Sequence, residues 1–264
     1  MIEFKNISAG YYKEKDVLKN ISFRVESGSW TGIIGPNGAG KSTMLKVLCG
    51  LLGCQGDVFL DSAVKEHVPL TAISKPEFAK VLAFMPQSIE NVFPFSVAEF
   101  VMLGRYPHLG AFKNPSSRDF KIVDEILEFI GISEFKNRNI NELSGGERQK
   151  VFIAQALAQE TEIIVLDEPV SYLDIGARTD ILNILAALNK ERKKTIVSTM
   201  HDLNAAAEFC DNLILIVDGQ IKSTGSPEKV LDYKIIEETY KTKVLVKENP
   251  MSKKPFVIPI KGNY

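Results

Sequence analysis

Apolar and polar residues alternate in two stretches near the start of the chain. The stretches cover residues 2–7 and 18–23, and a polar segment at residues 13–16 lies between them. Alternation with a period of two is typical of a strand that buries one face. We therefore expect two antiparallel strands joined by a polar turn.

Farther along, short apolar runs alternate with segments of helical periodicity. The runs of strand length lie at residues 30–34, 57–60, 81–85, 163–166, 195–198 and 213–217, and the helical segments lie at residues 43–48, 147–158, 178–191 and 203–209. Strands that alternate with helices favour a mostly parallel sheet covered on both faces. The pattern predicts an α/β fold.

A purely helical stretch interrupts this alternation. Residues 96–103 and 118–130 carry helical periodicity, and the prolines and glycines of residues 105–115 predict a loop between them. We therefore expect one domain of 264 residues with a core at residues 1–87 and 142–264 and a helical insertion at residues 88–141.

The tail of the chain, from residue 224 onward, has a weaker pattern. It predicts one helix and a final hairpin around residues 243–246 and 255–260. No chemistry is assigned to this tail by its residues.

A glycine-rich loop follows the apolar run at residues 30–34 and leads into the next helical segment. Residues 35–43 read GPNGAGKST, and a strand, this loop and a helix start together form a phosphate-binding pattern. Its glycines let backbone N–H groups approach phosphate oxygens, and the helix start is positive. We expect a nucleotide to be bound by the whole loop: Gly35, Pro36, Asn37, Gly38, Ala39, Gly40, Lys41, Ser42 and Thr43. In this pattern the lysine charge lies on the outer phosphates, and the serine hydroxyl ligates Mg²⁺.

Composition narrows the function classes. The net charge is −1, with a quarter of the residues charged, which argues against a protein built mainly to bind nucleic acid. No signal peptide is expected at the N-terminus, and no apolar run has the length needed to span a bilayer. Cys49, Cys54 and Cys210 are not at metal-binding spacing, and we expect buried or idle thiols.

Two carboxylates end the apolar run at residues 163–166. Asp167 and Glu168 follow it directly, and ligands of open α/β sheets bind where strands end. An aspartate there can hold Mg²⁺ through water, and a glutamate beside it can polarise an attacking water. Most acidic residues at strand ends lie in solvated turns. This pair indicates a functional site only because the glycine loop is also present.

A second candidate anion site lies at residues 143–147, which read LSGGE. Ser144 and Glu147 have the spacing of a capping box at a helix start. Gly145 and Gly146 are poor helix residues, at a cost of about 1 kcal/mol each relative to alanine. They make sense if a ligand must approach the backbone closely, since a capped helix start is itself an anion site.

The order of these motifs resembles the ATP-binding cassette (ABC) ATPase family over essentially the whole chain. LSGGERQ lies between GPNGAGKST and IIVLDEP. Gln87 resembles the glutamine of the family's Q-loop, residues 171–174 resemble its D-loop, and His201 resembles its switch histidine. Tyr12 matches the aromatic residue that stacks on adenine, with Tyr11 as the competing assignment. Val170 departs from the family, which usually has threonine or serine there.

The resemblance implies a P-loop NTPase core with an N-terminal antiparallel β subdomain and an inserted α-helical subdomain. It also implies a homodimer in which each ATP lies between the glycine loop of one copy and Ser144, Gly145, Gly146 and Glu147 of the other. The implied roles are catalysis by Glu168, His201, Lys41 and Gln87, and Mg²⁺ binding by Ser42, Gln87 and Asp167.

The segment VAEFVMLGRYPH at residues 97–108 resembles importers of iron–siderophore complexes, haem and cobalamin. This resemblance implies an ATPase subunit that lies in the cytoplasm on the inner face of the membrane and energises uptake of a metal chelate. Membrane permease subunits would dock on the segment from Phe93 to Arg105, and a substrate-binding protein would be an indirect partner. Phe100 is expected to be core instead, and which chelate is carried stays open.

Two other classes are weighed against an importer. One is a non-transport ABC ATPase that acts on nucleic acid or the ribosome, but such proteins usually carry a long coiled coil or two cassettes. The other is a regulatory nucleotide-binding subunit, against which Glu168 and His201 argue. Co-purification with a permease or with nucleic acid would discriminate between them.

Overall fold

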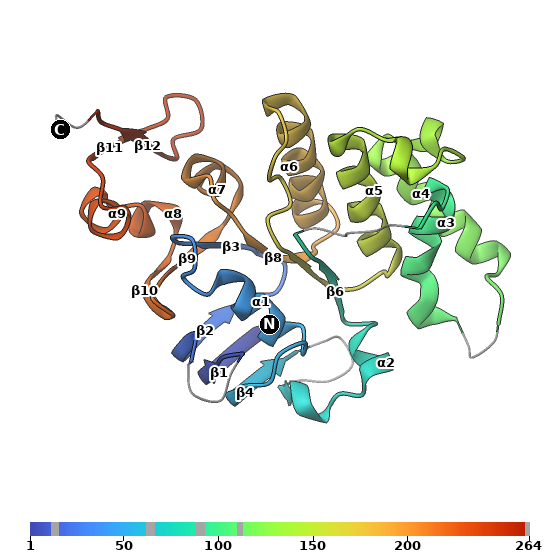
Figure 1. Ribbon diagram of the computed structural model, residues 1–264, viewed down its shortest axis with the longest axis horizontal. Helices are drawn as coiled ribbons and strands as arrows, with labels where there is room; N and C mark the ends of the chain where they lie inside the picture. Colours follow the sequence, from blue (N-terminus) through green and yellow to red (C-terminus); the bar gives the residue numbers. More distant parts are fainter. Residues whose placement is uncertain (12–15, 62–66, 88–92, 110–112, 262–264) are drawn as a thin grey trace. The chain divides into compact units, whose positions relative to one another are not determined.

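The computed structural model describes residues 1–11, 16–61, 67–87, 93–109 and 113–261 (Figure 1). The chain forms two compact units, which are described separately. Unit 1 contains Met1–Ala72 and Lys193–Tyr264, and unit 2 contains Ile73–Arg192. These bounds differ from those of the core and insertion expected from the sequence, and that division stays a prediction.

Unit 1 begins with an antiparallel sheet. Its strands are β1 (Ile2–Ala9), β2 (Leu18–Val25), β4 (Gln55–Leu60) and β5 (Val68–Pro69), in the order β2-β1-β4-β5. Ile2 pairs with Val25 on one side and with Leu60 on the other. All three are buried, which is what the alternation of apolar residues predicts.

A second sheet in unit 1 is mostly parallel. Its strands are β3 (Trp30–Ile34), β8 (Thr195–Thr199), β9 (Asn212–Val217) and β10 (Gln220–Gly225), in the order β10-β9-β3-β8. Strand β3 is parallel to both neighbours, and Ile33 pairs with Thr199 and with Ile214. The carboxyl ends of β3, β8 and β9 therefore meet at one edge.

Strand β10 is the antiparallel edge strand that the sequence pattern does not predict. Its residues alternate between exposed and half-buried positions, so they form no apolar run. Asp218 and Gly219, at φ 49° and 79°, form the turn from β9, and two residues with positive φ are the requirement of a tight hairpin turn.

The helices of unit 1 are α1 (Lys41–Leu48), the short 3₁₀ helix η1 (Leu70–Ala72), α7 (Leu203–Phe209), α8 (Pro227–Val230) and α9 (Tyr233–Tyr240), and the unit ends in a hairpin of β11 (Val244–Glu248) and β12 (Pro255–Pro259). The predicted hairpin is confirmed. The prediction of a single helix in the tail is wrong, because the extended backbone of Asp232 separates α8 from α9. Its carboxylate caps α9 by accepting hydrogen bonds from the backbone N–H groups of Lys234 and Ile235.

Unit 2 joins two parallel strands to a group of helices. Its elements are α2 (Lys75–Phe78), β6 (Leu82–Met85), α3 (Val97–Met102), η2 (Leu103–His108), α4 (Ser117–Ile130), η3 (Ser133–Phe135), η4 (Ile140–Glu142), α5 (Gly145–Ala158), β7 (Ile163–Leu166) and α6 (Ile175–Lys190). Helices α3, α4 and α5 pack against one another (Figure 1). Phe100 is buried against Phe152, as expected, with 5.5 Å between the ring centroids.

The first part of the loop predicted at residues 105–115 is the 3₁₀ helix η2, and the prediction is wrong there. Arg105 explains why, because only 3% of it is exposed. Its guanidinium donates hydrogen bonds to Asp119 Oδ1 at 3.0 Å, to the Ala158 carbonyl at 2.7 Å and to Glu160 Oε2 at 2.7 Å. Hydrogen bonds from Ser116 and Arg105 lower the pKa of Asp119 to about 2. One buried cation therefore joins η2, α4 and the end of α5.

Replacement of this cation tests how far unit 2 depends on it. We expect Arg105→Met to lower the free energy of unfolding by about 3–5 kcal/mol, because Asp119 is then buried without its cation. Lys121→Met is the control, since Lys121 forms an exposed pair with Glu125 on α4 and such pairs contribute roughly 0.5 kcal/mol. Urea denaturation measures both, and equal losses would contradict this account of Arg105.

No helix in the described part of the chain is both long enough and apolar enough to cross a membrane. The three thiols are free, with Cys49 and Cys210 buried and Cys54 exposed. Burial raises the pKa of Cys210, so this thiol is chemically inert at neutral pH.

Candidate functional site

The glycine loop connects β3 to α1 in unit 1. Gly35, Gly38 and Gly40 have φ angles of 149°, 78° and 105°, which residues with a Cβ rarely adopt. A Cβ on Gly35 would also collide with the carbonyl oxygen of Ile216 on β9. The backbone of this loop therefore depends on glycine for its course as well as for any close approach by a ligand.

Lys41 lies at the first position of α1 with 6% of its surface exposed. Its ammonium donates hydrogen bonds to the carbonyl oxygens of Gly35 at 2.9 Å and Pro36 at 3.0 Å. The positive charge is thus held over the loop, next to the N-terminal end of α1. Both features favour a bound anion.

His201 follows β8 at the same edge of the sheet as the glycine loop. The backbone N–H of Met200 donates to the carbonyl of Ile33 at 3.0 Å, so the ends of β3 and β8 are in register. Asp202 then caps α7 through hydrogen bonds from the N–H groups of Asn204 and Ala205. Unit 1 therefore brings two predicted site segments together, the loop and the histidine.

Of the two tyrosines considered for adenine, Tyr12 lies outside the described residues. Tyr11 is described, and its hydroxyl accepts a hydrogen bond from Lys46 at 3.2 Å and lies 3.4 Å from Thr43 Oγ1. The Lys46 ammonium is 5.1 Å from the centre of the ring. The Tyr11 side chain therefore lies against α1.

In unit 2, the ends of β6 and β7 bring Gln87 and Glu168 into contact. Gln87 Nε2 and Ser171 Oγ each donate to Glu168 Oε2 at 2.7 Å. Glu168 has a φ of 51°, an unusual backbone conformation for a residue other than glycine, and such residues gather at functional sites. The carboxylate is thus held from two directions.

Asp167 comes just before this carboxylate and is 5% exposed. Its backbone N–H donates to the carbonyl of Met85 at 2.9 Å, which continues the pairing of β6 with β7. The end of β7 therefore carries one buried and one more accessible carboxylate. No cluster of three or more His, Cys, Asp or Glu residues that could hold a metal occurs among the described residues.

The LSGGE segment forms the start of α5, also in unit 2. Ser144 is the N-cap, and its N–H and hydroxyl donate to Glu147 Oε2 at 2.8 and 2.7 Å. The N–H of Glu147 donates back to Ser144 Oγ at 3.4 Å. The predicted capping box is present, and these hydrogen bonds lower the pKa of Glu147.

The two glycines of this helix start differ in what surrounds them. A Cβ on Gly146 would lie 2.9 Å from the Cβ of Ala177 on α6, so packing within the chain accounts for Gly146. A Cβ on Gly145 would meet only Leu173, at an ordinary 3.9 Å, and Gly145 is exposed. Packing inside the chain therefore explains why glycine stands at position 146, but it does not explain the glycine at position 145.

Ser171 is absent from the set of site residues predicted by sequence reasoning. It lies in the segment that resembles the D-loop, three residues after Glu168. That spacing places its hydroxyl on the Glu168 carboxylate. A turn with a hydroxyl three residues after the second carboxylate is the signal that could have found it.

Comparison with known proteins identifies the family of this chain. The family model described as ABC transporter matches residues 18–171. The chain is 38% identical over 95% of its length to an uncharacterized ABC transporter ATP-binding protein, YvrA of Bacillus subtilis, of which it spans 56%. It is 35% identical over 98% of its length to the petrobactin import ATP-binding protein FpuD of Bacillus anthracis, of which it covers 93%. It is also 35% identical over 97% of its length to the ferric enterobactin transport ATP-binding protein FepC of Escherichia coli, again with 93% covered.

Two solved structures extend the likeness to the fold. An inward-facing putative metal-chelate type ABC transporter matches with a TM-score of 0.84 at 25% identity, covering 98% of this chain and 97% of the other. The dimeric structure of MJ0796, a bacterial ABC transporter cassette, matches with a TM-score of 0.74 at 30% identity, covering 86% and 99%. The fold is that of a P-loop NTPase with an N-terminal antiparallel sheet and a helical subdomain. The chain belongs to the ABC transporter family and is an ATP-binding protein of the kind that hydrolyses ATP.

Proposed function

We propose that this protein is the ATP-hydrolysing subunit of an importer and energises the uptake of an iron chelate. The observation that carries the proposal is the likeness over nearly the whole chain to ATP-binding proteins named for petrobactin import and ferric enterobactin transport. Siderophore complexes of iron are therefore the first cargo to test. Haem and cobalamin follow, because residues 97–108 resemble importers of all three.

ATP binding is assigned to the glycine loop and its flanks. Backbone N–H groups from Gly35 to Thr43 and the Lys41 ammonium stabilise the charge of the phosphates. Tyr12 stacks on adenine, with Tyr11 as the alternative. The contacts of Tyr11 with Thr43 and Lys46 show that its side chain is already engaged on α1.

Mg²⁺ fits the side chains proposed for it. Ser42, Gln87 and Asp167 offer a hydroxyl, an amide oxygen and a carboxylate, and hard oxygen donors suit this ion. Gln87 Nε2 donates to Glu168, so its Oε1 is the atom that suits a cation. When bound, the ion neutralises charge on the β- and γ-phosphate oxygens.

Hydrolysis is assigned to Glu168 and His201. Glu168 accepts a proton from, or polarises, the water that attacks the γ-phosphate, and Gln87 and Ser171 hold its carboxylate in place. His201 donates a hydrogen bond toward the γ-phosphate. The proton lost by the water passes to the Glu168 carboxylate as the bond between the β- and γ-phosphates breaks.

A second copy of the chain completes each site in this proposal. Ser144, Gly145, Gly146 and Glu147 of one copy cover the γ-phosphate held by the other. The exposed N-terminal end of α5 supports this, since its capping box is complete and Gly145 leaves space above the backbone. Two ATP molecules would then hold a homodimer closed until hydrolysis releases it.

Permease subunits are proposed to dock between Phe93 and Arg105. Phe93 is 73% exposed and Leu103 is 44% exposed, whereas Phe100 and Arg105 are buried. Only some residues of the docking segment are therefore accessible to a permease. Docking there would hold the protein on the inner face of the cell membrane, with a substrate-binding protein as an indirect partner.

Glu168→Gln tests the assignment of the catalytic carboxylate. The amide cannot take a proton, so we expect the ATP hydrolysis rate to fall on the order of 10²–10⁴-fold. ATP should then trap a dimer that sedimentation detects. Glu162→Gln, which changes an exposed residue before β7, is the control with unchanged activity. Hydrolysis by Glu168→Gln at the parent rate would contradict the assignment.

Gly145→Ala separates a role in catalysis from a role in stability. The added methyl fits within the chain, so the free energy of unfolding should stay unchanged or rise by up to about 1 kcal/mol. The ATP hydrolysis rate should nevertheless fall about ten-fold or more, because the methyl obstructs the N–H groups that approach the phosphate. Gly53→Ala, another exposed glycine with room for a methyl, should change neither quantity. Full activity of Gly145→Ala would show that nothing approaches this backbone.

A further inference from the structure

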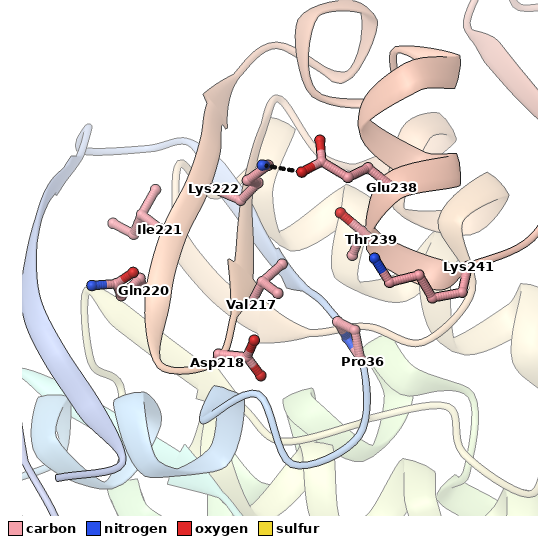
Figure 2. Close-up of a pocket in the computed structure, with 9 residues that line it drawn as sticks. All are labelled: Pro36, Val217, Asp218, Gln220, Ile221, Lys222, Glu238, Thr239 and Lys241. Carbon is pink, nitrogen blue, oxygen red and sulfur yellow. Dashed lines mark hydrogen bonds and ion pairs between the residues drawn. The ribbon is translucent and has the colours of Figure 1, made fainter.

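Unit 1 contains a cavity that the proposed function does not use. Its volume is about 530 Å³, and it lies between the β9–β10 hairpin and helix α9 (Figure 2). Val217 and Ile221 line it from the hairpin, Thr239 and Lys241 line it from the α9 side, and Pro36 of the glycine loop closes it below (Figure 2). A small organic molecule would fit a space of this size.

Four charged side chains line the cavity, and two of them form an ion pair with each other. Lys222 Nζ donates to Glu238 Oε1 at 2.8 Å, so these two charges compensate each other at one end (Figure 2). Asp218 and Lys241 are exposed. Neither side chain forms an ion pair or hydrogen bond with another described residue, although the charge of Lys241 also helps to lower the pKa of Glu238. One positive and one negative group therefore face a shared space.

Thr239 adds a buried group that lacks a partner. It is 9% exposed, and its hydroxyl has no hydrogen-bond partner in the described part of the chain. Buried hydroxyl groups are normally satisfied, and one that is not needs an explanation. It lines the cavity within two residues of Lys241, so both groups can donate to the same acceptor.

We propose that this cavity binds a small zwitterion of the amino-acid type, with its carboxylate on Lys241 and Thr239, its ammonium on Asp218 and its apolar part on Val217 and Ile221. A simple anion would lie near the like charge of Asp218, and a simple cation would lie near the like charge of Lys241, whereas each charge of a zwitterion lies near an opposite charge. The zwitterion pairs both charges and covers the apolar wall between them.

The cavity adjoins the nucleotide loop, so occupancy should affect nucleotide binding. Pro36 lines the cavity, and burial raises the pKa of Tyr240 to about 12, an effect that the nearby backbone of Gly35 partly offsets. Tyr240 follows Thr239 in the last turn of α9. A ligand that orders this turn therefore changes the loop that binds phosphate, and each ligand alters the affinity of the other by the same factor. This coupling rests on the proposed ATP site, whereas the binding itself does not.

Binding is tested with the full chain free of nucleotide. Each proteinogenic amino acid is titrated singly at millimolar concentration by calorimetry, with acetate and methylammonium as probes of one charge. At least one amino acid should bind saturably, and neither single-charge probe should match it. Asp218→Asn and Lys241→Gln should each weaken binding ten-fold or more, and the control Lys247→Gln on β11 should not. Absence of saturable binding, or binding indifferent to both variants, would overturn the proposal.

Thr239→Val provides a second, independent test. Valine keeps the shape and removes the hydroxyl, so the melting temperature should stay the same or rise while amino-acid binding weakens. A lower melting temperature with unchanged binding would show that the hydroxyl is structural and would reject its part in the site. A several-fold change in ATP affinity on saturation with the bound amino acid supports the coupling. An unchanged affinity rejects the coupling alone, and absence of ATP binding by the protein free of amino acid rejects the proposed function.

Discussion

The contact between Gly35 and β9 is the constraint on which the nucleotide loop depends. The carbonyl of Ile216 lies where a side chain on Gly35 would be, so the chain leaves β3 in a direction open only to glycine. That course places the carbonyls of Gly35 and Pro36 where Lys41 donates to them. The loop, its cation and the start of α1 thus form one arrangement, which holds positive charge and N–H groups ready for phosphate.

The remaining chemistry is divided between the two compact units. Unit 1 carries the glycine loop and His201, and unit 2 carries Glu168 with its two hydrogen-bond donors and the capped start of α5. In each unit, the proposed site residues lie at the carboxyl ends of parallel strands or at a helix start, where free N–H groups and side chains are available.

Sequence patterns predict the buried strands well. Strands β3, β7 and β8 are buried along their whole length. The edge strand β10 escapes prediction because half its residues face solvent, and η2 escapes because the tertiary contacts of Arg105 decide it. Spacing likewise gives no hint that Gly146 packs on Ala177 while Gly145 does not. Local sequence patterns do not predict the backbone conformation where a contact with a distant residue determines it.

In the proposed mechanism, one chain holds only half of each hydrolytic site. The most direct measurement is the ATP hydrolysis rate per molecule over a dilution series, with the fraction of dimer followed by sedimentation in the same samples. We predict that the rate per molecule falls on dilution in step with the dimer, although the dilute protein still binds ATP. A constant rate per molecule in samples that contain only monomer would contradict it.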